Sequence, residues 1–278
     1  MNQHTFHAMG TTFELAVEAD EADKAFAAAE VEVERLEQIM SRFRPDSELS
    51  RLNRDGSIDA SQDLAEVIEL ALDARERTGG RFDPTIHDAL VGAGYDRTFD
   101  DVDRETEAPA VASHCGGGVT ITGRRVELEP GVKLDLGGIG KGFAAERVAQ
   151  LLALTGPSLV SAGGDVAVRG VPTEGTWAVG VDETLTLGLT RGGLATSGRD
   201  RRQWRRAGIE QHHLIDPSTG RPSETDLVRV TAIGHDAVDA EVLAKDLFLA
   251  GSEEALARDL PAVLVTVDGR TLRTGGLV

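Results

Sequence analysis

Alternating apolar and polar residues predict strands in several parts of the chain. The segment 11–17 alternates directly after Gly10 and is predicted to be the first strand. Two short alternating runs within 119–128 flank Thr122-Gly123-Arg124-Arg125 and predict a hairpin. Further strands are predicted at 159–168, 176–181, 227–233 and 262–267, with a strand-rich stretch up to residue 192.

Apolar residues at three- and four-residue spacing predict the helices. The longest opens at Asp20 and runs to Met40, and a second spans about 63–77, where Gly79-Gly80 is placed to end it. A third follows the glycine-rich stretch 134–142 and continues to about residue 154, and two more are predicted at 238–249 and 253–258. The remaining segments lack this spacing: 41–53 is polar and turn-like, and 92–114 is acidic and indicates loop or edge structure.

The order of these elements sets the fold class. Helices and strands are mixed without a regular βα alternation, and neither a Pro/Ser-rich linker nor an internal repeat divides them. We therefore expect an α+β fold in which residues 1–278 form a single domain. A chain of 278 residues, 40% of them hydrophobic, is long enough to bury a substantial core.

The chain is strongly acidic, with 29 basic and 47 acidic residues and a net charge of −18. Nucleic acids bind basic surfaces, which release counterions from phosphate, so DNA and RNA are not expected as partners. No stretch approaches the roughly 20 apolar residues of a membrane span, and no signal for export or membrane insertion is visible. Because the single cysteine, Cys115, cannot form an intramolecular disulfide, we expect a cytoplasmic protein with a quiet thiol.

An acidic protein that binds phosphate needs a locally built site. The segment Asp135-Leu136-Gly137-Gly138-Ile139-Gly140-Lys141-Gly142-Phe143 offers one, since a strand end turns through glycines into a helix whose first turn carries a lysine. Such a turn supplies free backbone N–H donors and one positive charge. On pattern alone, a tight strand-to-helix connection explains it equally well, and its spacing matches neither a dinucleotide fingerprint nor a P-loop.

Two histidines, His212 and His213, precede the turn Asp216-Pro217-Ser218-Thr219-Gly220. A histidine beside a ligand can move a proton near neutral pH, as activation of a hydroxyl requires. The turn residues by themselves indicate only structure.

Glu241 and Lys245 lie four residues apart and share one face of the predicted helix at 238–249. Taken alone, this spacing indicates an ordinary surface ion pair. A small, hydroxyl-bearing segment, Ala195-Thr196-Ser197-Gly198-Arg199, is another candidate for contact with a ligand.

Three further segments join these in a fixed order along the chain. They are Ala8-Met9-Gly10-Thr11, the stretch 41–53 with Ser41-Arg42-Phe43-Arg44-Pro45, and Gly79-Gly80-Arg81-Phe82-Asp83-Pro84-Thr85. Together all these segments resemble the ApbE family of flavin transferases over nearly the whole chain, and the resemblance is specific because the matches are collinear. It implies mixed sheets and helices in two facing α+β halves around a central flavin-binding cleft.

The resemblance also implies an activity and a set of site residues. Members of the family bind FAD and, with magnesium, transfer its FMN half to a threonine or serine hydroxyl of a target protein, releasing AMP. The implied partners are therefore FAD and an acceptor protein, which the sequence does not identify. His213 matches the catalytic base. The residues that match the FAD contacts are Met9, Phe43, Arg81, Phe82, Asp83, Asp135, Lys141 and Leu214.

The implied metal site departs from the family pattern. The family's Mg²⁺ is held by a backbone oxygen corresponding to Gly138 and by an aspartate and a threonine where this chain has Glu241 and Lys245. Glutamate can still bind a hard cation, whereas a protonated lysine has no lone pair to give. Two outcomes are open: Lys245, paired with Glu241, takes the metal's place at the pyrophosphate, which we favour, or Gly138 and Glu241 hold Mg²⁺ more weakly.

This departure leaves three functions to be separated. The first is FMN transfer to a protein hydroxyl. The second is a non-catalytic FAD-binding or flavin-storage role, in which the metal chemistry has been lost. The third is hydrolysis, in which water replaces the acceptor and FAD is split into FMN and AMP.

Overall fold

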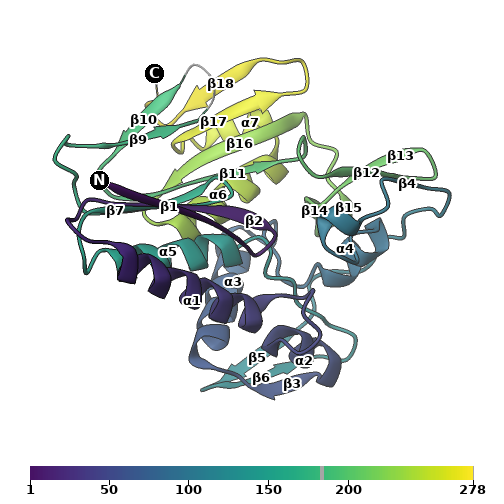
Figure 1. The fold of residues 1–278 in the computed structure, drawn as a ribbon. Coiled ribbons are helices and arrows are strands. Elements are labelled where there is room, and N and C mark those ends of the chain that lie inside the picture. Colours follow the sequence, from purple (N-terminus) through teal and green to yellow (C-terminus); the bar gives the residue numbers. More distant parts are fainter. Residues whose placement is uncertain (182–184, 278) are drawn as a thin grey trace.

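An eight-stranded antiparallel sheet forms the centre of the computed structural model, which describes residues 1–181 and 185–277. The two ends of the chain supply its two edges (Figure 1). From edge to edge the strands are β1 (Asn2–Ala8), β2 (Thr11–Val17), β7 (Ser158–Ala162), β8 (Asp165–Arg169), β11 (Gly192–Gly198), β16 (Leu227–Gly234), β17 (Ala262–Thr266) and β18 (Thr271–Thr274).

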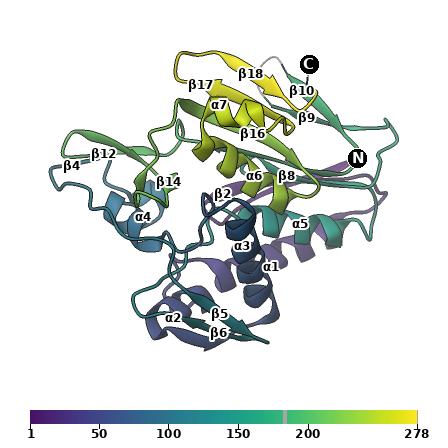
Figure 2. The ribbon, with the colours of Figure 1, turned by 180° about the vertical axis from the view of Figure 1, so that it is seen from behind.

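Helices α5 (Gly140–Leu152) and α6 (Ala237–Ala250) cover one face of this sheet, as the opposite views in Figures 1 and 2 show. Helix α5 packs on β7 and β8, whereas α6 packs on β11 and β16 and also contacts α5. Helix α1 (Asp23–Met40) lies against α5 and the edge strand β1, with α3 (Gln62–Arg77) beside it. The short helix α7 (Ser252–Ala257) follows α6.

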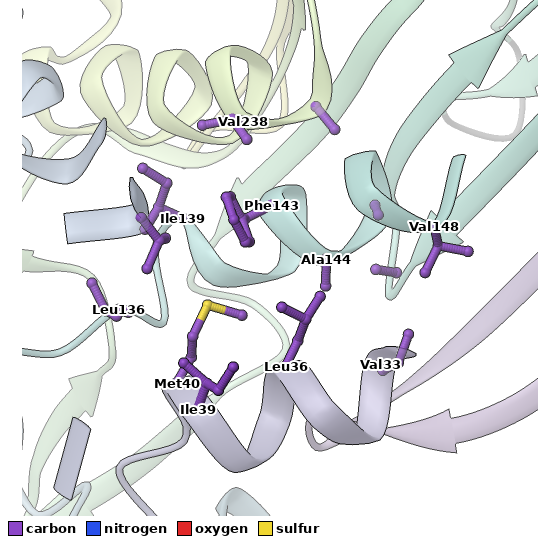
Figure 3. Packing of buried hydrophobic residues seen from close by; sticks show 14 of the residues in the cluster. Val33, Leu36, Ile39, Met40, Leu136, Ile139, Phe143, Ala144, Val148 and Val238 are labelled. Atoms are coloured by element: carbon purple, nitrogen blue, oxygen red, sulfur yellow. The ribbon is translucent and has the colours of Figure 1, made fainter. Parts of the chain in front are cut away.

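The apolar stripe of α1 builds the core between these helices. Leu36 and Met40 point toward Ala144 and Phe143 of α5, and Val238 of α6 closes the cluster from the other side (Figure 3). Leu36 is 0% exposed, and full burial of such a side chain contributes about 1.5–3 kcal/mol.

The opposite face of the sheet is covered by the antiparallel strands β9 (Trp177–Gly180) and β10 (Thr186–Leu189). Trp177 and Leu189 pack there on Val166 and Val168 of β8. Ala167, which lies between these two valines, belongs to the core on the helical face. Strand β8 is therefore buried on both sides, which explains its nearly continuous apolar sequence.

A smaller sheet in the order β13-β12-β4 stands to one side of the central sheet (Figure 1). Its Trp204 packs against Tyr95, with ring centroids 5.6 Å apart, and donates its Nε1–H to the carbonyl of Ala93 at 2.7 Å. Its strands and the nearby short elements are β4 (Glu105–Thr106), β12 (Gln203–Arg206), β13 (Ile209–His212), α4 (His87–Ala93), the 3-10 helix Phe99–Asp101, β14 (Ile215–Asp216) and β15 (Arg221–Pro222).

A third, three-stranded sheet lies beside helix α2 (Glu48–Asp55) in the order β3-β6-β5. It contains β3 (Ser57–Asp59), β5 (Val119–Thr122) and β6 (Arg125–Leu128). The last two form the hairpin that the sequence predicts.

The α+β class is confirmed, as are the main helices and the strands around 11–17, 227–233 and 262–267. The segment 159–168 is two strands rather than one, because Gly163 and Gly164 take φ values of +66° and +103° and reverse the chain. The segment 41–53 contains most of α2, which was missed. That helix begins after Ser47, whose hydroxyl accepts a hydrogen bond from the amide of Ser50, and it buries only Leu49 and Leu52.

Other elements were also missed, among them the central strand β11 and the strands β12 and β13 of the smaller sheet. Strand β1 and strand β18 are edge strands with half-exposed patterns, and α4 is a short helix of seven residues without a side-chain cap. In the part of the chain that the structure describes, no helix combines the length and apolarity needed to cross a bilayer.

We expect Leu36→Ala to lower the free energy of unfolding by about 2–5 kcal/mol, because it leaves a cavity between α1 and α5. The matched change Val31→Ala lies on the same helix at a side chain that is 69% exposed, and it should alter stability by less than about 0.5 kcal/mol. Urea unfolding of both variants measures the difference. Similar values for the two would contradict this packing.

Candidate active site

The glycine turn before α5 is shaped by Asp135. Its Oδ1 accepts a hydrogen bond from the amide of Gly137 at 2.8 Å, and its Oδ2 forms an ion pair with Arg42 Nε at 2.6 Å. Both side chains are buried, so each charge is neutralised by the other. A β-carbon on Gly137 would lie 2.9 Å from the Asp135 carboxylate, which explains a glycine here.

Lys141, Asp165 and Glu241 form a buried charge cluster where α5, β8 and α6 meet. The Lys141 ammonium contacts the carboxylates of both Asp165 and Glu241. The second oxygen of Glu241 accepts a hydrogen bond from the Gly142 amide in the first turn of α5 at 2.8 Å, where a negative charge is favoured. A β-carbon on Gly142 would lie 2.6 Å from the carbonyl of Ala237, so the two helices approach closely only because this residue is glycine.

The pKa values in this cluster reflect competition between burial and charge. Burial acts to lower the pKa of Lys141, but Asp165 and Glu241 outweigh it and raise that pKa. Burial raises the pKa of Glu241, and the neighbouring charge of Asp165 adds to this effect, while Lys141 opposes it. Lys141 therefore stays charged, and its ammonium forms ion pairs with two carboxylates.

Lys245 lies one helical turn beyond Glu241 and is only 6% exposed. Among the described residues, no carboxylate forms a salt bridge with its Nζ within 4.0 Å. The Nζ is 5.2 Å from the centroid of the Phe82 ring, and a β-carbon on Gly138 would lie 2.8 Å from it. Burial lowers the pKa of Lys245, although the more distant charges of Asp135, Glu241 and Asp83 act in the opposite direction.

The interpretation of Glu241 and Lys245 as a surface ion pair is therefore wrong. Both are buried, and Glu241 pairs with Lys141 instead. The pairing that we favoured for a lysine in the metal's place is wrong for the same reason, although Lys245 does lie against the glycine turn.

The two adjacent histidines have different environments. The Nε2 atom of His212 lies 3.0 Å from the carbonyl oxygen of Ser223, and its Nδ1 accepts a hydrogen bond from the amide of Leu214 at 3.3 Å. It is fixed by the backbone on both sides, and burial lowers its pKa to about 4.

His213 is half-buried, and its buried Nδ1 has no hydrogen-bond partner among the described residues. Burial lowers its pKa well below the ordinary value, and the positive charges of Arg202, Lys245 and Lys141 contribute to this shift. The ring is therefore neutral near pH 7 and has a nitrogen available to accept a proton.

Asp165 is a site residue that sequence reasoning missed. It is 3% exposed, contacts Lys141, and accepts a hydrogen bond from the amide of Thr196 at 3.3 Å. The Thr196 hydroxyl in turn lies 2.9 Å from that of Thr231. The only signal in the sequence is an aspartate directly after Gly163-Gly164 and before an apolar strand.

Three other sequence-predicted residues are consecutive, at 81–83. Phe82 is buried beside Lys245, and Asp83 accepts hydrogen bonds from the amide and hydroxyl of Thr85. Arg81 forms ion pairs with Asp246 of α6 and Glu254 of α7.

Three further predicted residues, Leu214, Phe43 and Met9, make contacts of other kinds. Leu214 is 3% exposed and belongs to a core cluster that includes Leu247 and Phe248 of α6. Phe43 stacks beneath the Arg42 guanidinium, 4.2 Å from its ring centroid. Met9 lies in a turn with a φ of +52°, and its amide donates to Glu37 at 3.0 Å.

The thiol of Cys115 is buried, within reach of the charges of Asp83 and Lys245. Burial raises its pKa to about 11, which supports the prediction of a quiet thiol.

These features define an α+β protein in which two lysines, Lys141 and Lys245, and two carboxylates, Asp165 and Glu241, gather where the glycine turn meets α6. The ApbE family model matches residues 9–262, and the chain belongs to the ApbE family. It is 30% identical to the FAD:protein FMN transferase of Treponema pallidum, covering 88% of this chain and 78% of the relative. It is 27% identical to the FAD:protein FMN transferase of Escherichia coli K12, covering 96% and 84%.

Solved structures of the family share the fold. The ApbE protein of Thermotoga maritima matches with a TM-score of 0.86 and 25% identity, covering 98% of this chain and 96% of that one. The flavin transferase ApbE of Vibrio cholerae matches with a TM-score of 0.77 and 24% identity, covering 98% and 96%.

His212 should make the protein less stable as the pH falls. Its pKa is about 4 in the folded chain against 6.5 for an ordinary histidine, so between these values the unfolded chain binds the proton more tightly. The free energy of unfolding therefore decreases as the pH is lowered through this window. We expect His212→Gln to flatten the decrease, as measured by urea unfolding across that pH range. A slope equal to that of the wild type would contradict the assignment.

Proposed function

We propose that this chain is a FAD:protein FMN transferase. In the proposed reaction, the oxygen of a threonine or serine hydroxyl attacks the phosphorus on the FMN side of the FAD pyrophosphate. A phosphoester bond to FMN forms, the P–O bond to the AMP phosphate breaks, and AMP leaves with the bridging oxygen. The proposal rests on two lysines at the glycine turn, Lys141 in the first turn of α5 and Lys245 beside Gly138, whose charges act on the neutral ring of His213, in a chain that matches the family over residues 9–262.

His213 is the proposed base. Its neutral ring can take the hydroxyl proton, whereas both nitrogens of His212 are occupied by the backbone. The positive charges of Lys141 and Lys245 lower the proton affinity of His213 in the free protein. An anionic ligand offsets these charges, so binding of FAD should raise the pKa of His213 and make it a stronger base.

The remaining residues are proposed to bind and orient FAD. The amides at the start of α5 and the ammonium of Lys141 face the pyrophosphate in this proposal, and Asp135 keeps the turn in shape through Gly137. Phe43, Phe82, Leu214, Met9, Arg81 and Asp83 are proposed as the outer contacts.

The Mg²⁺ ion implied by the family does not fit the residues of this chain. One oxygen of Glu241 contacts Lys141 and the other accepts the Gly142 amide, so neither is free. An ammonium, that of Lys245, lies against Gly138, whose carbonyl was the other expected ligand. In the described part of the chain, no group of three or more His, Cys, Asp or Glu residues is arranged to hold a metal. No step of the proposed reaction is routed through a metal ion.

The proposed partners are FAD and an acceptor protein, and nucleic acid is left out because the chain carries a net charge of −18. The cytoplasm is the proposed compartment, since Cys115 is a single free thiol.

Expression of the chain in E. coli K12 from which its own FAD:protein FMN transferase has been deleted tests the activity. We expect fluorescent, covalently flavinylated protein bands to reappear on a denaturing gel. Purified protein incubated with FAD and the flavin-free acceptor should release AMP in step with the labelling. Free FMN and AMP without labelling would point to hydrolysis, and bound FAD without AMP would point to a storage protein; either result would overturn the transferase proposal.

Replacement of the base should stop the chemistry without preventing binding. We expect His213→Asn to lower the rate of transfer by about 10²- to 10⁴-fold, with the dissociation constant for FAD changed only a few-fold. His235→Gln is the matched control, because that side chain is 75% exposed and far in sequence from the turn. An active His213→Asn enzyme would exclude His213 as the base.

The pH profile offers a second readout of the same residue. Because the pKa of His213 is held well below 6.5, the ring of the free enzyme stays neutral as the pH falls through that value. The rate at low FAD concentration should therefore show no inflection near pH 6.5.

A further inference from the structure

The Lys245 side chain is buried, and among the described residues no carboxylate lies within 4.0 Å of its Nζ. A charged group in the interior normally pairs with an opposite charge, because an unpaired one loses its hydration without compensation. Lys245 is 6% exposed, and its nearest described groups include the face of the Phe82 ring and the backbone at Gly138. A cation over an aromatic face gains much less than one in an ion pair, so the N–H donors of Lys245 are left for a ligand.

The acidic residues around Lys245 are already engaged. Glu241 is held by Lys141 and the Gly142 amide, and Asp135 by Arg42 and the Gly137 amide. Asp83 accepts two hydrogen bonds from Thr85 and lies 3.5 Å from Arg75 Nε. None of the three can turn to Lys245 without leaving another polar group unpaired.

The absence of a side chain at Gly138 leaves room for the end of the Lys245 side chain. A β-carbon on Gly138 would lie 2.8 Å from Lys245 Nζ and 3.3 Å from the Phe82 ring, so the glycine provides the space in which the ammonium sits. Lys245 and Glu241 are successive residues on one face of α6, and the second anchors that helix to the start of α5. The Lys245 Nζ therefore lies beside the turn whose amides are proposed to meet the pyrophosphate.

We propose that Lys245 is a built-in cation of this site, which binds the FAD pyrophosphate directly and makes FAD binding and FMN transfer independent of divalent metal. The proposal rests on the proposed function for the identity of the ligand. An ammonium offers three donors and one positive charge to the phosphate oxygens, which offsets the charge that develops on them. It differs from a metal in that no ligand exchange accompanies binding.

A purely structural role is the alternative. Lys141 carries one positive charge against the two carboxylates of Asp165 and Glu241, so Lys245 could serve only to balance this cluster. In that case its replacement would reduce stability and leave the affinity of the folded protein for FAD unchanged.

The affinity of the purified flavin-free protein for FAD, measured by fluorescence titration in EDTA and in saturating MgCl₂, separates these roles. We expect wild-type affinity to be equal in the two solutions within about twofold. Lys245→Met keeps the length of the side chain but removes its charge, and it should weaken FAD binding about ten- to a hundredfold in both. Lys24→Met is the matched control, since Lys24 is exposed on α1, and it should bind FAD as the wild type does.

A double variant, Lys245→Thr with Glu241→Asp, restores the oxygen ligands of the family pattern. We expect it to bind FAD weakly in EDTA and at least tenfold more tightly with MgCl₂. Circular dichroism and thermal unfolding establish that each variant is folded. If Lys245→Met does not fold, the wild-type comparison in EDTA and MgCl₂ still decides the question.

Wild-type FAD binding that requires Mg²⁺, or unchanged affinity in folded Lys245→Met, would overturn the proposal. These results leave the transferase function untouched, since an enzyme that needs Mg²⁺ for binding can still label its acceptor. Conversely, FAD binding that needs Lys245 but no metal, without any AMP release, would contradict the transferase function and agree with this proposal.

Discussion

The site depends on the carboxylate of Glu241, which joins α6 to the start of α5 through two contacts. One oxygen contacts the Lys141 ammonium and the other accepts the Gly142 amide, so α6 is tied to the first turn of α5. Asp165 completes the connection by bringing the start of β8 to the same lysine. These contacts hold the glycine turn at the meeting point of two helices and the central sheet, and the position of Lys245 follows from the same helix.

The sequence was sufficient for the fold class and for most of the long elements, because their hydrophobic spacing reports directly which face is buried. The stripe of α1 that ends at Met40 is one example, and Figure 3 shows that stripe facing α5. Elements with little buried surface gave no such signal: α2 buries two leucines, and the edge strand β18 buries only Thr274. Their positions are set by caps, turns and contacts with neighbouring elements, which the spacing of apolar residues does not reveal.

The site was harder to predict than the fold, because side-chain partners come from distant segments. The i to i+4 spacing of Glu241 and Lys245 correctly placed them on one face of a helix, but spacing contains no information about depth. Once α6 is buried, Glu241 meets Lys141 from 100 positions earlier, and Lys245 is left beside the glycine turn. Asp165 could not be found from a local motif, since its role exists only where β8 meets α5.

The Arg42 guanidinium has contacts on two sides of the site. It forms the ion pair with Asp135 that shapes the glycine turn, stacks over the rings of Phe43 and Tyr95, and donates to the carbonyl of Tyr95 at 2.7 Å. Tyr95 belongs to the aromatic cluster with Trp204. The Arg42 guanidinium therefore links the smaller sheet to the glycine turn. A molecule that displaced it from the rings would also break its ion pair with Asp135, so a change in the aromatic cluster would alter the turn.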